Sequence, residues 1–496
     1  MPADLITAFP RQPQALRLLP LAAVLTLALA GCAAVGPNYE GAPKVASDAT
    51  QADHFNRADQ AQGTVSNGPA AAQWWLTLND PVLTSLIDQA LKDSPNVHAA
   101  QARLRQSRAA LKQQQANELP KASASALGIG VRQGPDTDAA QTLHLYSAGF
   151  DASWEIDLFG GTRRAVEAAS AEAQAVQADL ADAQVSLAAE VAQSYAGLRE
   201  QQQRQALLRQ TATGDEQSLA LSRQRRERGV APAQEVEQRL SQLESTRASL
   251  AEVAAQLSAS LDQLAFLTGQ SSGSLDARLA APQGDGQGQA QAALPALPST
   301  VAVGDPTTLL SRRPDIRAAE RRLASRQAQI GTKVANYFPK LSLLGNIGFS
   351  STEASHLVRQ ENFSMLGVPY LSWNLFDFGQ TRSQVRQAEA TRDEYVARYE
   401  NTVLTALRDA NTALSRFGHQ REELLSLMAQ EASTTRKLDL MRQRRQAGTA
   451  SQIDLLDAQR ELASARQRTV SGQAELVKDF VSLQKSLGLG WAAEAS

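Results

Sequence analysis

Cysteine and histidine, which commonly bind metals or act in catalysis, are scarce in this chain. It has one cysteine among 496 residues, and its five histidines are scattered: His54, His98, His144, His356 and His419. A single cysteine excludes a disulfide framework and a multi-thiolate metal site. Scattered histidines leave little for zinc or copper coordination, and only four methionines disfavour a copper cargo. We therefore expect no catalytic residue and no metal site, and we predict that the chain is not an enzyme.

One pattern imitates a catalytic motif. Residues 269–273 have the Gly-x-Ser-x-Gly spacing of a hydrolase nucleophile, which requires a strand before it and a helix after it. Here the pattern follows a predicted coiled-coil helix and enters a stretch rich in Gly, Ser and Gln. We interpret it as a chance match.

The clearest grouping of ionisable side chains is a pair of carboxylates, Asp454 and Asp457, just after a glycine turn at Gly448. A spacing of three places both on one helix face. Crowded carboxylates can bind cations, and some have raised pKa values. From spacing alone, a solvated face near a helix amino terminus is the better interpretation, since the helix dipole favours acidic residues there.

The sole cysteine lies at the end of a predicted secretion signal. Arg11 and Arg17 precede an apolar run from Leu18 to Ala30, which is too short to span a bilayer. The run ends in Leu-Ala-Gly before Cys32, which resembles the lipobox of bacterial lipoproteins. The resemblance implies a lipid on Cys32 and, because position 33 is not Asp, sorting to the outer membrane. A buried thiol after an ordinary secretory signal is the alternative.

Composition favours long helices over a thick globular core. The chain is 43% hydrophobic but only 5% aromatic, and its 49 basic and 51 acidic residues give a net charge of -2. This balance argues against a nucleic-acid partner. No window after the signal offers a spanning apolar run. If the mature chain crosses a membrane, it must do so as β-strands.

The chain is a tandem repeat with one constant offset of 219 residues. Pro95 returns as Pro314 (314−95), Trp154 as Trp373 (373−154), and the run 223–226 returns as 442–445. Glu235 is therefore the equivalent of Asp454 (454−219). A register without gaps over this length predicts two copies of one structural unit.

Each unit is predicted to begin with a helix and a strand hairpin. The helix starts near Pro95 and ends before Pro120, and it recurs between Pro314 and Pro339. Strands are expected at 121–132 and 143–154, and again at 341–350 and 363–373. Their length of about 11 residues and their apolar-polar alternation suit membrane strands with lipid on one side. An ordinary surface hairpin is the alternative.

A long helical hairpin closes each unit. Residues 163–228 predict one helix of roughly 100 Å, which turns at Gly229. The return helix has a leucine every seventh residue, typical of a coiled coil. These leucines are Leu243, Leu250, Leu257 and Leu264, with Leu462, Leu476 and Leu483 keeping the same period in the second unit. Residues 33–70 and 270–300 are predicted to be loose.

Four strands cannot close a barrel, and an open sheet edge cannot face lipid. The smallest common membrane barrels have about eight strands, so the chain must oligomerise if its strands insert. Helices of roughly 100 Å greatly exceed a bilayer core of about 30 Å and must project into water. A conduit or a tether follows from this combination.

The chain resembles the outer membrane factors, the TolC-like exit ducts of efflux systems, in their lipoprotein branch. The matching residues are Val35-Gly36-Pro37-Asn38-Tyr39 after Cys32, Trp74-Trp75 with Asp80-Pro81, the stretch from Leu310 to Leu323 around Arg312-Arg313-Pro314-Asp315-Ile316-Arg317, and Tyr337-Phe338-Pro339-Lys340-Leu341-Ser342-Leu343.

The resemblance implies a fold that is mainly α with membrane β. It implies a homotrimeric 12-strand β-barrel with four strands per chain, a periplasmic α-helical coiled-coil barrel and an equatorial belt. The implied partners are a periplasmic adaptor protein, an inner-membrane pump of the RND type and outer-membrane lipid. No cofactor is implied beyond the covalent lipid.

The resemblance also implies roles for particular residues. Asp454, Asp457 and Glu235 would line the periplasmic gate. The turns Gly229-Val230 and Gly448-Thr449 would contact the adaptor. Arg445 and Ala450 stand where relatives have Tyr and Arg, so the bonds that close this gate are not implied.

We expect the chain to divide into five segments. These are a signal peptide (1–31), a lipidated segment with the belt (32–90), a first repeat (91–269), a linker (270–309) and a second repeat (310–490). An exit duct without an energy source of its own is the predicted function. The alternatives are a periplasmic coiled-coil tether without a pore and a periplasmic adaptor. The cargo is not predicted.

Overall fold

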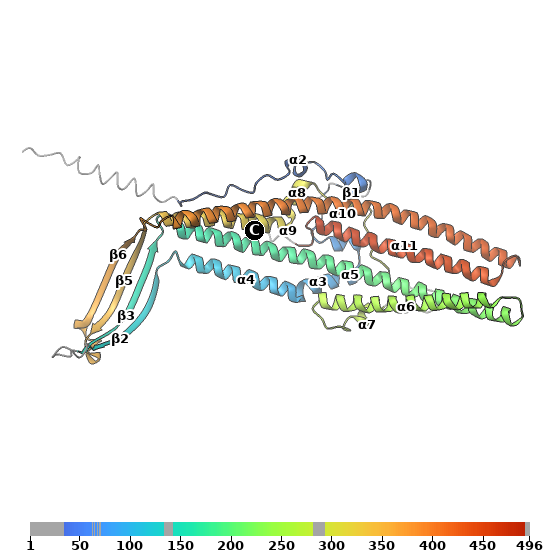
Figure 1. The fold of residues 1–496 in the computed structure, drawn as a ribbon, viewed down its shortest axis with the longest axis horizontal. Helices are drawn as coiled ribbons and strands as arrows, with labels where there is room; N and C mark the ends of the chain where they lie inside the picture. Colours follow the sequence, from blue (N-terminus) through green and yellow to red (C-terminus); the bar gives the residue numbers. More distant parts are fainter. Residues whose placement is uncertain are drawn as a thin grey trace, which may run out of the picture. The chain divides into compact units, whose positions relative to one another are not determined.

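The computed structural model describes residues 34–61, 63, 65–66, 68, 71–132, 142–280 and 293–491. Cys32 and the predicted signal segment lie outside these residues. Contacts divide the chain into two units, each built from several stretches of sequence (Figure 1). The first unit holds 34–42, 105–174 and 320–397, and the second holds the rest. The longest helices contribute residues to both units.

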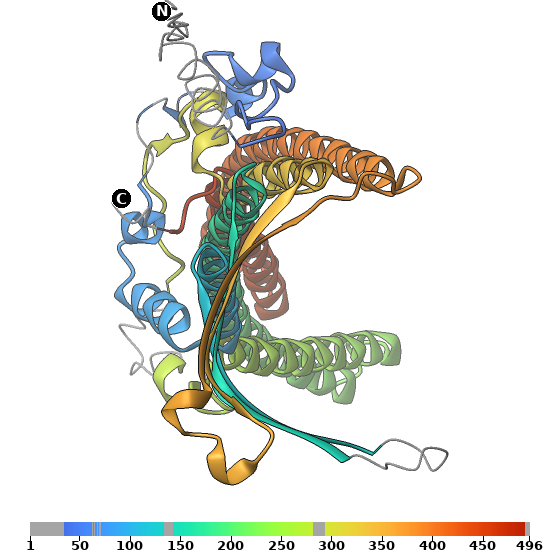
Figure 2. The same ribbon diagram turned by 90° about the vertical axis from the view of Figure 1, so that its left-hand side faces the viewer.

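The first unit contains one antiparallel sheet in the order β2-β3-β5-β6. The strands are β2 (Lys121–Arg132), β3 (Thr142–Ile156), β5 (Lys340–Ser351) and β6 (Phe363–Ser372). They form a strongly curved ribbon (Figure 2). The four predicted strands are confirmed, with ends that differ by at most two residues.

The sheet register gives the two faces different chemistry. Phe150 lies opposite Ile347, and Ile347 lies opposite Met365, so these three apolar side chains share one face. The other face carries a polar group, in which Asp151 accepts hydrogen bonds from Ser125 at 2.5 Å and from Asn346 at 2.7 Å. The apolar face therefore runs across β3, β5 and β6, whereas on β2 the large apolar residues Leu127, Ile129 and Val131 lie on the other face, together with Ser125.

The segment that follows Cys32 is fixed against the first unit, although 33–70 was predicted to be loose. The Val35 N–H donates to the Phe159 carbonyl at 3.0 Å. The Arg164 guanidinium donates to the Val35 carbonyl at 3.2 Å and to the Asn38 side chain at 2.6 Å. Gly36 has φ +88° and lies so close to Gly331 that a Cβ would be 2.5 Å from its Cα. The prediction was wrong here because these bonds form only with residues distant in sequence.

The second unit contains the turn-bearing parts of two helical hairpins. The helices are α5 (Gly161–Glu227) with α6 (Ala233–Leu267), and α10 (Gln380–Gln446) with α11 (Gln452–Ser486). The first helix of each pair has 67 residues and the second has 35, as expected for repeats. Among the predicted seam leucines, Leu243 and Leu264 are buried, while Leu250 and Leu257 are half-buried.

Shorter elements complete the described chain. They are α2 (Ser47–Thr50), η1 (Ala58–Ala61), β1 (Val65–Ser66), η2 (Trp74–Leu78), α3 (Pro81–Asp93), α4 (Pro95–Ala116), α7 (Asp276–Leu279), β4 (Val301–Ala302), α8 (Pro306–Arg312), α9 (Pro314–Val334), η3 (Ala335–Tyr337), η4 (Ala354–His356) and η5 (Gln360–Asn362).

Trp74 is buried, with its ring 5.8 Å from Trp75 and 5.9 Å from Phe480. Trp74 therefore packs against α11, which carries Phe480. Over the residues described, the helices include none with the length and apolar character needed to cross a membrane.

Asp479 is a buried carboxyl in the middle of this packing. Its residue is 8% exposed on α11, one position before Phe480. Burial, followed by repulsion from Glu475, raises its pKa from 3.8 to about 6. The folded chain therefore holds a proton at Asp479 more tightly than the unfolded chain does.

This proton makes stability depend on pH. Because the folded pKa is raised, the contribution of Asp479 is present below about pH 4 and is lost as the pH rises through about 6. We expect Asp479→Asn to stabilise the chain at about pH 8, by at most about 3 kcal/mol, and to change little at about pH 4. Thermal unfolding by circular dichroism at both pH values measures this. Asp262→Asn, on the exposed side of α6, is the control, and an effect of Asp479→Asn that is equal at both pH values would contradict the prediction.

Candidate functional site

The two helix turns and the charged residues beside them form the candidate site. Gly229 and Gly448 have φ of +73° and +74°, a conformation that glycine adopts without strain. At both turns the following N–H, of Val230 or Thr449, donates at 2.9 Å to a carbonyl in the last helical turn. This geometry closes the helix ends in the Schellman manner. The turn residues are exposed, and whether they contact an adaptor stays a prediction.

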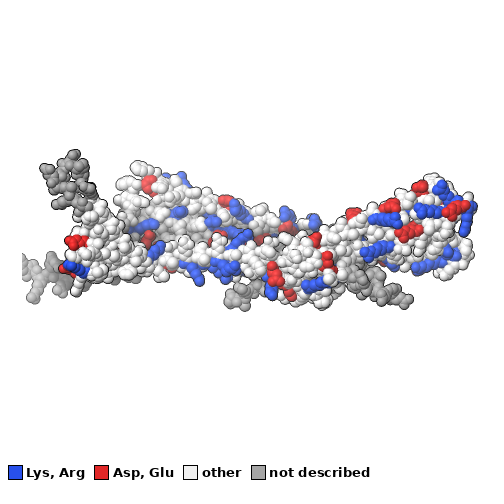
Figure 3. Space-filling view, turned by 90° about the horizontal axis from the view of Figure 1, so that it is seen from below, with Lys and Arg blue, Asp and Glu red and all other residues white. Residues whose placement is uncertain are grey.

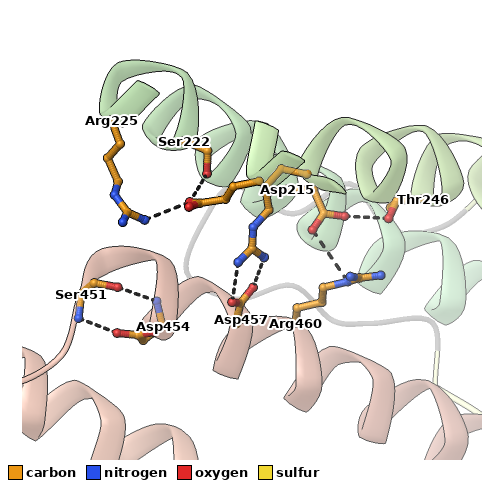
Figure 4. A network of polar contacts seen from close by, with 10 residues as sticks. Asp215, Ser222, Arg225, Thr246, Ser451, Asp454, Asp457 and Arg460 are labelled. Carbon is orange, nitrogen blue, oxygen red and sulfur yellow. Dashed lines mark hydrogen bonds and ion pairs between the residues drawn. The ribbon is translucent and has the colours of Figure 1, made fainter. Parts of the chain in front are cut away.

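Asp454 is held at the start of α11 by a capping box with Ser451 (Figure 4). The Asp454 carboxylate accepts from the Ser451 N–H at 2.7 Å, and the Ser451 hydroxyl accepts from the Asp454 N–H at 3.1 Å. Hydrogen bonding to the Ser451 side chain, and then to its backbone, lowers the pKa of Asp454. Within one chain the cap stabilises the charged form of Asp454. Whether crowding with carboxylates of other chains raises any pKa stays a prediction.

Asp457 forms an ion pair that sequence reasoning missed. Arg239 on α6 donates from both terminal nitrogens to the two Asp457 oxygens, at 2.5 Å and 2.9 Å. The hydrogen bonds from Arg239 are bidentate, the strongest geometry for such a pair. The same contact raises the pKa of Arg239. Because α6 and α11 belong to different repeats, this pair links the two helical hairpins of one chain.

A second link between the hairpins lies at Asp215 (Figure 4). This carboxylate on α5 has a side chain only 7% exposed. It accepts a hydrogen bond from the Thr246 hydroxyl of α6 at 2.7 Å, and it lies 3.7 Å from the Arg460 guanidinium of α11. A buried carboxylate needs such partners, since an unpaired one would be strongly destabilising. Asp215 therefore fixes three helices against one another.

Glu235 has different surroundings from its repeat equivalent, Asp454. Its carboxylate accepts from the Ser222 hydroxyl at 3.1 Å and from Arg225 at 2.9 Å, both on α5. Glu235 therefore binds within its own hairpin. In the second repeat Met441 takes the position of Ser222 (441−219), so the equivalent bond cannot form there. Pro232 replaces Ser451 (451−219), and α6 starts without a side-chain cap.

The missed residues had a signal in the repeat comparison. Arg239 and Thr246 lie seven residues apart, in register with the buried Val253 of the α6 seam. Their equivalents in the second repeat are the buried residues Ala458 and Ala465 (458−239 and 465−246). A polar residue at a seam position that is apolar in the sister repeat indicates a specific partner.

Charges of both signs cover the helix ends. Figure 3 shows basic and acidic side chains intermixed over the turn-bearing ends of the helices on the visible face. No group of three or more His, Cys, Asp or Glu is placed to hold a metal ion among the described residues. The arrangement at the turn-bearing helix ends consists of paired charges that join helices.

A strand hairpin followed by a helical hairpin, present twice in one chain, defines a tandem-repeat class of protein. The sequence model of the family described as outer membrane efflux protein matches residues 86–270 and 306–489. The chain therefore belongs to the outer membrane efflux protein family, which confirms the resemblance stated from the sequence.

Individual relatives agree with this assignment. The chain is 32% identical to the outer membrane protein OprJ of Pseudomonas aeruginosa, over 95% of each chain. It is 30% identical to the pyoverdine export outer membrane protein OpmQ of the same species, over 85% of this chain and 88% of that one. The solved structure of the outer-membrane channel OprN has 33% identity and a TM-score of 0.78, and covers 92% of this chain and 99% of OprN.

Loss of the Arg239–Asp457 pair is expected to make the start of α11 more mobile. Arg239→Ala leaves Asp457 without its bidentate partner, so we expect faster amide hydrogen exchange at the start of α11. Exchange measured by mass spectrometry over residues 446–460 tests this. The exchanged pair Arg239→Asp with Asp457→Arg is expected to restore part of the protection.

Arg247→Ala is the matched control. Arg247 also lies on α6 and pairs with Glu216 and Glu244, but both partners belong to the first hairpin. This variant is expected to leave residues 446–460 unchanged. Equal acceleration in both variants would show that Arg239 acts on the fold in general and not through Asp457.

Proposed function

We propose that the chain is the outer-membrane exit duct of a tripartite efflux system. The observation that carries this function is a four-stranded sheet with one apolar face and, among the described residues, no neighbouring strand at either edge. In each repeat its strands are joined to a helical hairpin too long for any bilayer. Three copies supply 12 strands and close the sheet into a barrel. The helices then continue the passage into the periplasm.

The duct works with two partners. An inner-membrane pump of the RND type supplies the energy, and a periplasmic adaptor joins the pump to the turns at Gly229-Val230 and Gly448-Thr449. The duct itself performs no chemical reaction and needs no metal or soluble cofactor. It passes small molecules when the adaptor shifts an existing equilibrium between closed and open turns.

The amino terminus anchors the duct. Cys32 carries the lipid after residues 1–31 are removed, and the bonds of Arg164 to Val35 and Asn38 place the anchored segment beside Phe159. Residues 32–90 then supply the anchor and belt, 91–269 and 310–490 the two repeats, and 270–309 the linker between them.

The gate lies at the start of α11. Asp454 and Asp457 of three chains bring six carboxylates to the aperture, and Glu235 adds three from the first repeat. The capping box supports this role, because it holds the charged Asp454 side chain in place at the start of α11. Arg239 neutralises Asp457 in the closed arrangement and ties α6 to α11. Loss of that tie frees both the helix and the carboxylate.

Conductance across a planar bilayer tests both the duct and the gate. The purified protein is expected to conduct in small steps at rest and to migrate on a gel in a heat-dependent manner, as folded barrels do. Asp454→Ala with Asp457→Ala is expected to raise the resting conductance and to weaken block by divalent cations. Asp262→Ala is the control. A protein that never conducts would support a tether, and an unchanged double variant would remove these residues from the gate.

The cargo is a separate question. One relative at 30% identity is named for pyoverdine export, while OprJ carries no cargo in its name, so likeness to relatives does not choose among cargoes. Growth of a deletion strain and its parent across a panel of antibiotics, solvents and small organic toxins identifies the class of molecule exported.

A further inference from the structure

The two repeats contribute equivalent residues to one cavity, at the end of the sheet where β2 and β5 begin. The cavity has a volume of about 490 Å³, and its lining residues all belong to the first unit. Lys121 and Lys340 both line it, as do Asn117 and Asn336. Each of these pairs is related by the repeat offset of 219 (340−121 and 336−117). A cavity of this size accommodates a small organic molecule.

The strand register places Lys121 on the face of the sheet that carries Asp151. Lys121 lies opposite Ser153, and Ser153 lies opposite Leu344, so these three side chains form one row across β2, β3 and β5. Asp151 is two residues from Ser153 on the same strand and therefore shares this face. The apolar face of β3, β5 and β6, which the proposed duct turns toward lipid, is the opposite one. In the duct the row that contains Lys121 then faces the aqueous passage.

The acidic residues that line the cavity already have cationic partners, whereas Lys121 has none. Glu155 pairs with Lys340 at 3.7 Å. Asp157 accepts a hydrogen bond from the Arg163 N–H at 2.8 Å and lies 3.6 Å from the Arg163 guanidinium. Among the described residues Lys121 forms no ion pair. Each chain therefore places one positive charge without a counter-charge in the lining of the cavity.

The rest of the lining combines amide groups with apolar side chains. The Asn117 amide donates to the Gln114 side chain at 3.1 Å, and both residues line the cavity together with Asn336. Leu344 is 45% exposed and lies in the same row as Lys121. Amide and ammonium N–H groups donate hydrogen bonds to anionic oxygens, whereas an exposed leucine favours contact with a hydrocarbon group. The lining thus suits a molecule with an anionic end and an apolar end.

We propose that this cavity binds an amphipathic organic anion, a carboxylate attached to an apolar group, as it passes through the duct. The Lys121 ammonium pairs with the carboxylate, the side-chain amides of the lining supply further hydrogen bonds, and Leu344 contacts the apolar group. Lys340 stays paired with Glu155. The inference deepens the proposed function, because it names a class of cargo and rests on the chain being a duct.

The binding is weak, as a passage requires. Lys121 is exposed, so water and salt screen its attraction for a carboxylate, and one such ion pair changes affinity by about threefold. A molecule held no more tightly than this still leaves the site quickly, which conduction demands. The cavity therefore favours anions over neutral molecules of the same shape without trapping them.

Three probes of one shape and different charge test the cavity. They are phenylacetate, 2-phenylethanol and 2-phenylethylammonium, and their binding to the purified full chain in mild detergent is measured by ligand-observed nuclear magnetic resonance. Phenylacetate is expected to bind about threefold more tightly than 2-phenylethanol at low salt, and the ammonium probe no more tightly than the alcohol. The preference for phenylacetate is expected to disappear at about 1 M salt. Equal binding of the three probes at low salt overturns the proposal.

Substitutions assign the preference to Lys121. Lys121→Gln is expected to reduce phenylacetate binding to the level of the alcohol, and Lys121→Arg is expected to retain the preference. Lys112→Gln is the matched control, because Lys112 is also exposed and in the first unit, but it lies on α4 outside the cavity lining. Leu344→Ser is expected to weaken the binding of all three probes. An unchanged preference in Lys121→Gln, or its loss in Lys112→Gln, overturns the proposal.

Block of the current across a planar bilayer relates the cavity to the duct. Phenylacetate is expected to reduce the current of the unsubstituted chain at about threefold lower concentration than 2-phenylethanol does, and Lys121→Gln is expected to remove this difference. If the chain conducts but neither binding nor block depends on Lys121, the cavity proposal fails and the duct stands. If phenylacetate binds through Lys121 but the chain never conducts, the duct fails, and the role of the cavity in export fails with it.

Discussion

Backbone N–H and C=O groups at a sheet edge need hydrogen-bond partners wherever water is absent, and this need constrains the whole molecule. The outer edges of β2 and β6 have no neighbouring strand among the described residues. A single chain with such edges and an apolar sheet face is not stable in lipid, however well its helices pack. Self-association is therefore a condition for membrane insertion and not a later elaboration of the fold.

The tandem repeat supplies the strands of the sheet by using one strand hairpin twice. β5 is the equivalent of β2, and β6 is the equivalent of β3, because the opposed pairs Lys121–Ser153 and Lys340–Ser372 are separated by the repeat offset of 219 (340−121 and 372−153). The two helical hairpins are less alike, because they carry different residues at the positions that form the charged links. In the first repeat two seam positions hold Arg239, which pairs with Asp457 of the second repeat, and Thr246, which donates to Asp215. In the second repeat the same positions hold Ala458 and Ala465. The strands of the two repeats are thus equivalent, whereas the helical hairpins differ in the residues that link them near the turns.

Features with a regular period could be predicted from the sequence. Strand bounds were correct to within two residues because apolar and polar residues alternate over their full length, and the first long helix was predicted over 163–228 and observed over 161–227. The leucines predicted at seven-residue spacing do lie on one seam of the helix. Their burial varies along the seam because the helices do not contact one another evenly.

Features that depend on a single distant partner could not be predicted in this way. The Arg239–Asp457 pair joins residues 218 positions apart, and nothing in the local sequence of either residue identifies the other as its partner. The capping role of Asp454 could be predicted only if the start of α11 at Gln452, one residue after Ser451, were already known. The bonds of Arg164 to Val35 and Asn38 were missed for the same reason, since a short Gly- and Pro-containing segment has no period of its own.

The strengths of the charged links suggest how a closed turn can still be opened. Arg239 and Asp457 are both partly exposed, so water screens their attraction, and such pairs typically contribute about 0.2–1 kcal/mol. This amounts to less than about a tenfold bias, too little to hold a passage shut. Asp215 is the stronger constraint, because its carboxylate is buried and separation from Arg460 would leave that charge with the neutral hydrogen bond from Thr246 but without this cation. The weaker link, at Asp457, lies closer along α11 to the turn, and the stronger link, at Arg460, lies three residues farther from it. The start of α11 can therefore separate from α6 while Arg460 and Asp215 still join the two hairpins.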